Sequence, residues 1–279
     1  MAKVVIEDLP EGVVFGNLES LFSEMLHQMG LMLPRAAAVF INSFEELDKT
    51  ITDDLKSKLN NFLNVGPFNI LSTMSSSPPA LDENGCLPWL DKQEAASVVY
   101  ISFGTIMVPS VEELVAIADA LEGGGVPFIW SISDNAKANL PNGFLDKTKE
   151  YGLVVPWAPQ AEILSHRAVG VCVMHCGWNS MLESIVGGVP MICKPFFADH
   201  GLNLRTVVDV WEIGVRVEGE VFTKEEFERC LNLVLYKEEG KKMREKIKFL
   251  KELATKALDP RGSSTANFKL LQGIITKSE

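Results

Sequence analysis

The chain has 279 residues, of which 47% are apolar and 23% charged, and its formal net charge is −11. This composition is typical of a folded globular protein, and the length is enough for about two domains of ordinary size. The negative charge argues against non-specific nucleic-acid binding and against docking on anionic membranes, because both require basic surfaces. No apolar run reaches the roughly 18 residues of a membrane helix, so membrane insertion is not expected.

The five cysteines contain no C-x-x-C pair: they are Cys86, Cys172, Cys176, Cys193 and Cys230. An odd number without that spacing predicts buried free thiols in a reducing compartment, and the cytoplasm is the expected location. Cys172, His175 and Cys176 are close enough in sequence to suggest a metal. However, Cys172 falls in an apolar strand and no fourth ligand is evident, so no metal site is expected.

Residues before position 86 differ in pattern from the rest of the chain. Apolar residues recur at helical spacing over 18–32, with Asn17 as the candidate N-cap. A short buried strand is expected over 36–41 and a charged helical segment over 44–59. The serine- and proline-rich stretch 71–85 can supply neither a core nor a regular element, which predicts a linker.

After this linker, short apolar strands alternate with helices. Apolar runs of this kind indicate a parallel sheet covered on both faces, and hence an α/β domain of Rossmann-like type. Strands are expected over 98–103, 128–132, 153–155, 169–174 and 189–193, and helices over 111–121, 179–186, 223–236, 238–258 and 265–275.

The turn at 175–180 lies between a buried strand and a helix. Ligands of open parallel sheets bind beyond the carboxyl ends of the strands. A helix start offers N–H groups and the positive dipole end, which suit a diphosphate. Gly177 allows close approach of the backbone, and His175 adds a side-chain donor for charge on a leaving phosphate.

A longer pattern surrounds this turn, from Trp157 to His200. It contains Trp157-Ala158-Pro159-Gln160, His175-Cys176-Gly177-Trp178-Asn179-Ser180, Glu183, Pro195-Phe196-Phe197 and Asp199-His200. It resembles the plant secondary-product glycosyltransferase box of the family-one UDP-glycosyltransferases. Segments 87–91, 97–105 and 262–264 also agree with that family. The opening segments 9–30 and 33–48 are similar to those of the subgroup acting on the 3-hydroxyl of flavonoids.

The resemblance implies a nucleoside site in the first part of the box. Trp157 would stack on uracil, and the backbone of Ala158 and the side chain of Gln160 would fix the base and ribose. Glu183 would accept hydrogen bonds from the ribose hydroxyls, a role that suits an ionised carboxylate. The alternatives are that Trp157 only packs and that Glu183 only complements the helix dipole.

The resemblance also implies a diphosphate and sugar site. The diphosphate would be held by His175, Asn179, Ser180 and Thr105, and the sugar hydroxyls would be faced by Trp178, Asp199 and His200. His200 stands where glutamine is commoner in the family, and galactose-preferring relatives often carry histidine there. The donor is therefore expected to be UDP-galactose or UDP-glucose, with no cofactor and no metal.

The implied fold has two Rossmann-like domains of the GT-B type. Residues 1–70 would be a remnant of the N-terminal acceptor domain, 71–85 the linker and 86–258 the UDP-sugar-binding domain. Residues 259–279 would form a C-terminal helix packed back on the N-terminal portion. The implied reaction is inverting transfer of a hexose to a flavonoid hydroxyl, expected to be the 3-OH, by a monomeric enzyme.

The general base of the family is expected to be absent, because its histidine lies in an N-terminal part that this chain lacks. None of the four histidines, His27, His166, His175 and His200, occupies that context. The alternative function is therefore a non-catalytic UDP-sugar-binding fragment. A sugar-nucleotide epimerase is a third possibility, but it would need acid–base carboxylates of its own.

Overall fold

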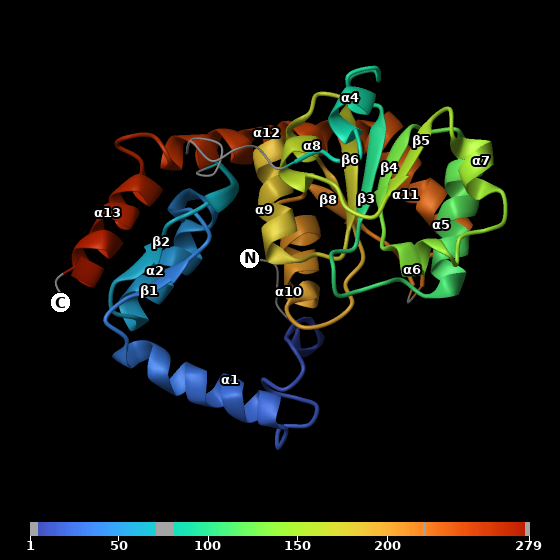
Figure 1. Ribbon diagram of the computed structural model, residues 1–279. Coiled ribbons are helices and arrows are strands. Elements are labelled where there is room, and N and C mark those ends of the chain that lie inside the picture. Colours follow the sequence, from blue (N-terminus) through green and yellow to red (C-terminus); the bar gives the residue numbers. More distant parts are fainter. Residues whose placement is uncertain (1–4, 71–80, 220, 277–279) are drawn as a thin grey trace. The chain divides into compact units, whose positions relative to one another are not determined.

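The computed structural model describes residues 5–70, 81–219 and 221–276 (Figure 1). Positions 71–80 of the predicted linker lie outside the described residues. The chain divides into two compact units. The large unit is built from described residues between 81 and 248, and the small unit from those before 71 and after 248.

Six strands form the sheet of the large unit (Figure 1). Their order in space is β5-β4-β3-β6-β7-β8, and every neighbouring pair is parallel. Counted along this unit, the order is the 3-2-1-4-5-6 of doubly wound Rossmann sheets. The strands are β3 Val98–Ser102, β4 Phe128–Ser131, β5 Gly152–Val155, β6 Val169–Met174, β7 Met191–Cys193 and β8 Gly214–Arg216.

Helices cover both faces of this sheet, which is why its strands are apolar on both sides. α5 (Val111–Gly124) and α11 (Lys224–Tyr236) pack together on one face, and α8 (Gln160–Ser165) and α9 (Trp178–Gly187) pack together on the other (Figure 1). Among the described residues, no helix combines the length and apolar character needed to cross a membrane. The unit also contains α4 Cys86–Leu90, α6 Asp134–Lys137, α7 Phe144–Thr148, α10 His200–Arg205, a π-helical turn Thr206–Val210 and the first part of α12 Glu238–Ala257.

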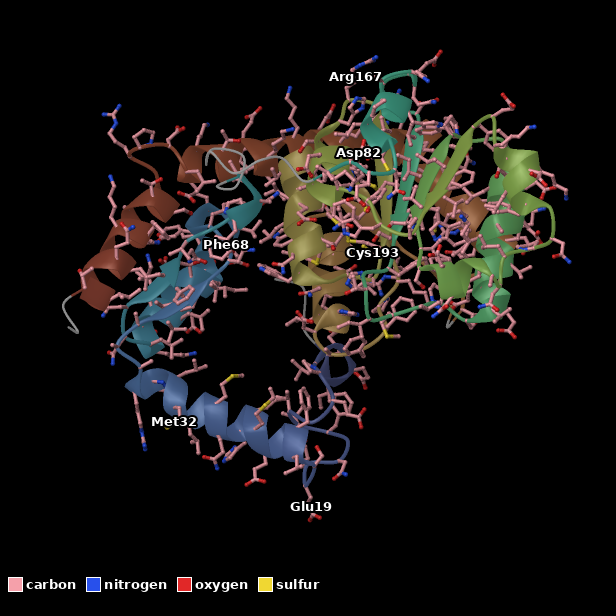
Figure 2. All side chains as sticks on the ribbon, viewed as in Figure 1. Glu19, Met32, Phe68, Asp82, Arg167 and Cys193 are labelled. Carbon is pink, nitrogen blue, oxygen red and sulfur yellow. The ribbon has the colours of Figure 1, made fainter. Side chains whose placement is uncertain are left out.

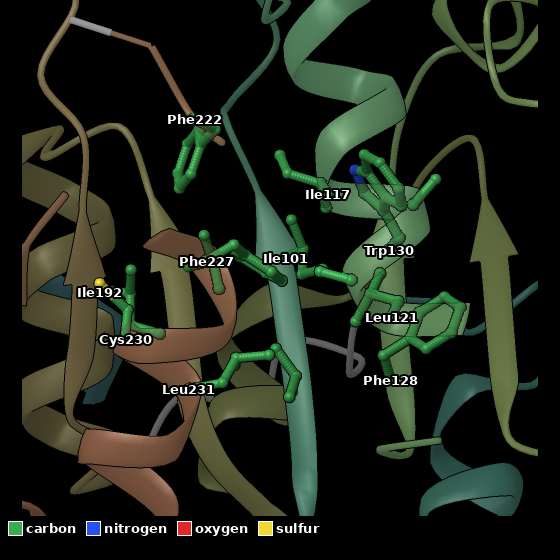
Figure 3. Close-up of a cluster of buried hydrophobic side chains, with 14 of the residues drawn as sticks. Ile101, Ile117, Leu121, Phe128, Trp130, Ile192, Phe222, Phe227, Cys230 and Leu231 are labelled. Carbon is green, nitrogen blue, oxygen red and sulfur yellow. The ribbon is translucent and has the colours of Figure 1, made fainter. Parts of the chain in front are cut away.

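The main core lies between the sheet, α5 and α11 (Figure 3). Ile101 of β3 packs there with Ile117 and Leu121 of α5 and with Trp130 of β4, and all four side chains are fully buried. Burying side chains of this size contributes about 1.5–3 kcal/mol each. The five cysteines are buried free thiols, as predicted.

The small unit contains a two-stranded parallel sheet, β1 Val39–Ile41 and β2 Phe62–Asn64. Asn267 of the C-terminal helix donates hydrogen bonds to Asn64 O at 3.0 Å and to Glu45 Oε1 at 2.8 Å. Leu271 packs with Leu63 and Val65. The helices of this unit are α1 Leu21–Met32, α2 Lys49–Lys58 and α13 Ser263–Thr276, with short 3-10 turns Ile6–Asp8, Leu33–Arg35 and Glu45–Leu47.

Two predicted helices of the small unit differ from the structure. The helix expected over 18–32 begins at Leu21, because Ser20 rather than Asn17 caps it by accepting a bond from Ser23 N. The segment expected over 44–59 is interrupted at Asp48, whose carboxylate caps α2. Strands β2 and β8 were not predicted, because each has three residues and contains a polar or charged one, Asn64 or Arg216. The equally short β1 and β7 were predicted because they lie in longer apolar runs.

Candidate functional site

The candidate site lies at the carboxyl edge of the large unit's sheet. Arg167, before β6, and Cys193, at the end of β7, mark the amino and carboxyl edges respectively (Figure 2). The chain leaves β3 toward one side of the sheet and β6 toward the other, so the strand order reverses between these two neighbours. The loops that follow β3 and β6 therefore flank a topological switch point, where open α/β sheets bind ligands.

His175 lies between these two loops. A Cβ atom at Gly104 would lie 3.0 Å from His175 Cε1, and one at Gly177 would collide with Nε2. Gly104 also has a φ of +79°, which favours glycine. Burial, together with a smaller effect of His200, lowers the pKa of His175 to about 4 against the opposing effects of the Ser102 backbone and Asp199. His175 is therefore a neutral imidazole at pH 7 and can donate through one ring nitrogen.

His200 begins α10 and is 5% exposed. Its ring centroid lies 5.0 Å from that of His175, edge to face, and 4.9 Å from that of Phe197. The backbone N–H groups of Phe196 and Phe197 donate to His200 Nδ1 at 3.4 Å each. Burial lowers the pKa of His200 against the opposing effect of Asp199. Because Nδ1 accepts both backbone bonds, the neutral ring carries its proton on Nε2.

Asn203 was missed by the sequence reasoning. It is 5% exposed, and its Nδ2 donates to Cys176 O at 2.9 Å and to Asp199 Oδ2 at 2.9 Å. It thus joins the turn after β6 to the start of α10. Only its spacing four residues after Asp199 could have signalled the contact. We call the group His175, Asp199, His200 and Asn203 the histidine cluster.

A second polar group forms between α8 and α9. Gln160 Nε2 donates to Glu183 Oε2 at 2.6 Å and to Ser180 Oγ at 3.0 Å, and Tyr100 OH donates to Gln160 Oε1 at 3.2 Å. Burial raises the pKa of Glu183, the Gln160 bond opposes that shift, and Glu162 adds to it. We call Tyr100, Gln160, Ser180 and Glu183 the glutamine cluster. Tyr100 had not been singled out from the sequence.

The remaining predicted residues lie around these clusters. Trp157 is 49% exposed, and its carbonyl accepts a bond from Asn84 Nδ2 at 2.8 Å. Ala158 is buried beside it. Thr105 is exposed, directly after Gly104, whereas Trp178 and Asn179 form the first turn of α9. The Trp178 ring centroid lies 6.5 Å from that of Trp211.

His166 lies outside this edge. Its Nε2 faces Asp91 Oδ1 at 3.2 Å, and its Nδ1 accepts a bond from Ala168 N at 3.2 Å. It precedes β6, at the amino edge of the sheet. Although it forms a histidine–aspartate pair, both of its ring nitrogens are occupied, so it is not suited to abstract a proton.

The family of the chain follows from comparison with known proteins. A family model described as UDP-glucoronosyl and UDP-glucosyl transferase matches residues 75–256. The chain belongs to this family. The expected family resemblance is thereby confirmed.

Plant relatives match almost the whole chain. The chain is 61% identical over 275 residues to anthocyanidin 3-O-glucosyltransferase 7 of Manihot esculenta, covering 99% of this chain and 95% of that protein. It is 57% identical to anthocyanidin 3-O-glucosyltransferase UFGT of Vitis vinifera and 55% identical to flavonol 3-O-glucosyltransferase of Arabidopsis thaliana, covering 99% of this chain in each case. The chain spans 60% of the length of each of these last two relatives.

Solved structures agree with the fold. A UDP-glucose:anthocyanidin 3-O-glucosyltransferase in complex with UDP matches with a TM-score of 0.90 and 43% identity, over 98% of this chain and 61% of that one. Phytolacca americana UGT2, complexed with UDP-2fluoro-glucose and pterostilbene, matches with a TM-score of 0.86 and 30% identity, over 97% and 60% of the two chains. The predicted fold class, the Rossmann-like part of a GT-B glycosyltransferase, is confirmed.

Proposed function

We propose that the large unit binds the UDP portion of a UDP-sugar at the carboxyl edge of its sheet. The observation that carries this proposal is the position of His175, a neutral donor between Gly104 and Gly177 beside the start of α9. A helix start and a side-chain N–H at a switch point suit a diphosphate. The UDP and UDP-2fluoro-glucose complexes of two similar proteins support the same ligand class.

The nucleoside is assigned to Trp157, Ala158, Gln160 and Glu183. The exposed Trp157 ring stacks on uracil, and Gln160 with the Ala158 backbone fixes the base and ribose. Glu183 accepts hydrogen bonds from the ribose hydroxyls, because Gln160 satisfies only part of its capacity as an acceptor. No metal is required by this assignment.

The diphosphate is assigned to His175, Thr105, Asn179 and Ser180, and the sugar to Trp178, Asp199 and His200. In an inverting transfer, the acceptor oxygen attacks the anomeric carbon while UDP leaves and gains negative charge. Donors already in place at His175 and the start of α9 stabilise that charge. We propose a flavonoid 3-hydroxyl as the acceptor, in keeping with the names of the plant relatives.

Transfer also needs a general base for the acceptor hydroxyl. His166 has both nitrogens occupied, and His175 and His200 belong to the proposed donor site. The fourth histidine, His27, lies in α1, outside the sequence context expected of the family's general base. We therefore propose that this chain, taken alone, binds UDP but transfers no sugar at a useful rate. A missing general base typically costs about 100- to 10,000-fold.

The donor sugar is proposed to be glucose or galactose, with His200 contributing to the choice. Because its Nδ1 accepts from two backbone N–H groups, His200 can offer a ligand only the Nε2 donor. A glutamine would offer both a donor and an acceptor. The packing of His200 against Phe197 is the competing explanation for its identity. We expect His200→Gln to change the ratio of UDP-galactose to UDP-glucose affinities by about tenfold, and an unchanged ratio would assign His200 to packing alone.

Calorimetric titration with UDP, with ADP as the control nucleotide, tests the binding proposal. Product analysis with quercetin and each UDP-hexose tests the proposed lack of transfer. We expect saturable binding of UDP, much weaker binding of ADP and no rapid product formation. Equal affinity for UDP and ADP would contradict the nucleoside assignment, and rapid transfer would contradict the binding-module proposal.

A further inference from the structure

A buried ion pair lies beside the proposed donor site but outside both polar clusters. Lys194, directly after β7, pairs with Glu113 in the first turn of α5. The side chains are 9% and 4% exposed. Burying two charges is costly unless the remaining hydrogen-bonding groups are satisfied as well. The surroundings of this pair satisfy that condition.

Glu113 is held by three donors from different parts of the chain. Ser110 N donates to its Oε2 at 3.0 Å, which completes the capping box of α5. Phe222 N donates to its Oε1 at 3.0 Å, and Lys194 Nζ contacts the same oxygen. Glu113 therefore joins the end of the loop after β3 to the residue that begins the loop after β7.

Two aromatic rings lie against the Lys194 ammonium group, and a third ring packs against both of them. Its Nζ lies 5.2 Å from the ring centroid of Phe196 and 5.3 Å from that of Phe222, within the range of cation–π attraction. Phe103 lies 5.9 Å from each of these two rings. Phe103 precedes Gly104 and Thr105, and Phe196 lies three residues before Asp199. The ring cluster thus includes residues at the start of two of the loops that carry proposed donor residues, the loop after β3 and the loop after β7.

We propose that the Glu113–Lys194 pair is a positioning device, which holds the loop after β7 so that Asp199 and His200 face the sugar. This inference rests on the proposed function. It assigns Lys194 no contact with the ligand, since its ammonium group is occupied by Glu113 and by the faces of Phe196 and Phe222. Loss of the pair should therefore weaken binding of the sugar and leave binding of the nucleoside unchanged.

The test is the ratio of the UDP-glucose and UDP dissociation constants in Lys194→Met. A variant that is merely less folded binds both ligands less well by the same factor, so this ratio separates positioning from general destabilisation. We expect the ratio to rise about tenfold, because the contacts to the hexose are lost while the nucleotide contacts remain. Lys194→Arg, which keeps the cation, is expected to stay within about twofold of the wild type.

Lys147→Met is the matched control. Lys147 of α7 pairs with Glu122 of α5 at 2.8 Å but is 58% exposed, so the same substitution there removes an exposed ion pair that involves none of the proposed donor residues. An unchanged ratio in Lys194→Met, or an equal rise in Lys147→Met, would overturn the proposal. A Lys194→Arg ratio as high as that of Lys194→Met would also overturn it. If Lys194→Met does not fold, the double variant E113Q/K194M, which leaves no single buried charge, takes its place.

Deuterium exchange in the absence of ligand separates this proposal from the proposed function. If the wild type binds neither UDP nor UDP-glucose, the proposed function fails and exchange alone decides the positioning role. We expect faster exchange over residues 195–200 in Lys194→Met than in the wild type or in Lys147→Met. Equal exchange over this segment in all three proteins would overturn the positioning role.

Discussion

The glutamine cluster and the histidine cluster lie at the same edge of the sheet but are stabilised in different ways. In the glutamine cluster, side chains bond to one another at 2.6–3.2 Å, so polar groups are already paired. In the histidine cluster, two imidazoles pack edge to face, and burial lowers the pKa of both. The first cluster is suited to exchanging hydrogen bonds with hydroxyls, whereas the two imidazoles of the second stay neutral until a ligand brings negative charge.

His175→Ala should produce the largest difference between the two clusters. We expect UDP affinity to fall roughly 10- to 100-fold, because a hydrogen bond to a charged group contributes about 1.5–3 kcal/mol. Uridine affinity should stay within about twofold, since Gln160 and Glu183 are unchanged. Calorimetry with both ligands measures this contrast, and His166→Ala at the opposite edge is the control. Similar losses for UDP and uridine would mean that His175 acts on the whole site.

The neutral state of His175 predicts a dependence of stability on pH. The folded-state pKa is lowered from 6.5 to about 4, so the unfolded chain binds the proton first as the pH falls. The contribution of the neutral His175 ring to the free energy of unfolding is fully present above about pH 6.5 and is lost progressively toward pH 4. Full conversion of the shift at 1.36 kcal/mol per pKa unit gives roughly 3–4 kcal/mol. Solvent screening of this half-buried ring makes the actual contribution smaller.

Urea unfolding of the wild type and of His175→Asn at pH 7, 5.5 and 4.5 measures this contribution. We expect the wild type to lose more unfolding free energy on acidification than the variant, which lacks the titrating imidazole. His200 shifts in the same direction and remains in both proteins, so the difference between them isolates His175. Parallel losses in the two proteins would contradict the buried neutral state of His175.

Glu183→Gln should produce a smaller effect that is confined to the nucleoside. We expect uridine and UDP to lose affinity by the same factor, about fivefold, because a ribose hydroxyl loses a charged acceptor. The variant should also lose the preference for uridine over 2′,3′-dideoxyuridine. Glu150→Gln, an exposed position in the turn before β5, controls for the loss of one charge. A retained preference for uridine would remove the ribose role from Glu183.

The fold of the large unit was largely predictable because its longer elements carry strong local signals. The apolar run over 169–174 and the helix that follows it appear in the structure as β6 and α9. The turn between them also marked His175 as a candidate. By contrast, β2 and β8 were missed because a polar or charged residue, Asn64 or Arg216, ends each short apolar run.

The partners of the site residues were less predictable than the residues themselves. Tyr100 meets Gln160 across 60 positions, and Asn203 meets Cys176 across 27, through contacts that exist only after the sheet has formed. The pairing of Glu113 with Lys194 had no local signal at all. Sequence spacing can indicate which side chains lie at a strand end, but only packing determines which atoms they contact.

The most direct test of UDP binding at this edge is the change in amide chemical shifts when UDP is added to the wild-type chain. We predict that the largest shifts fall on residues 104–105, 157–160 and 175–183, the segments to which the nucleoside and the diphosphate are assigned. Residues 166–168, at the amino edge, should not move. Shifts centred on 166–168, or no saturable change at any concentration of UDP, would contradict the account.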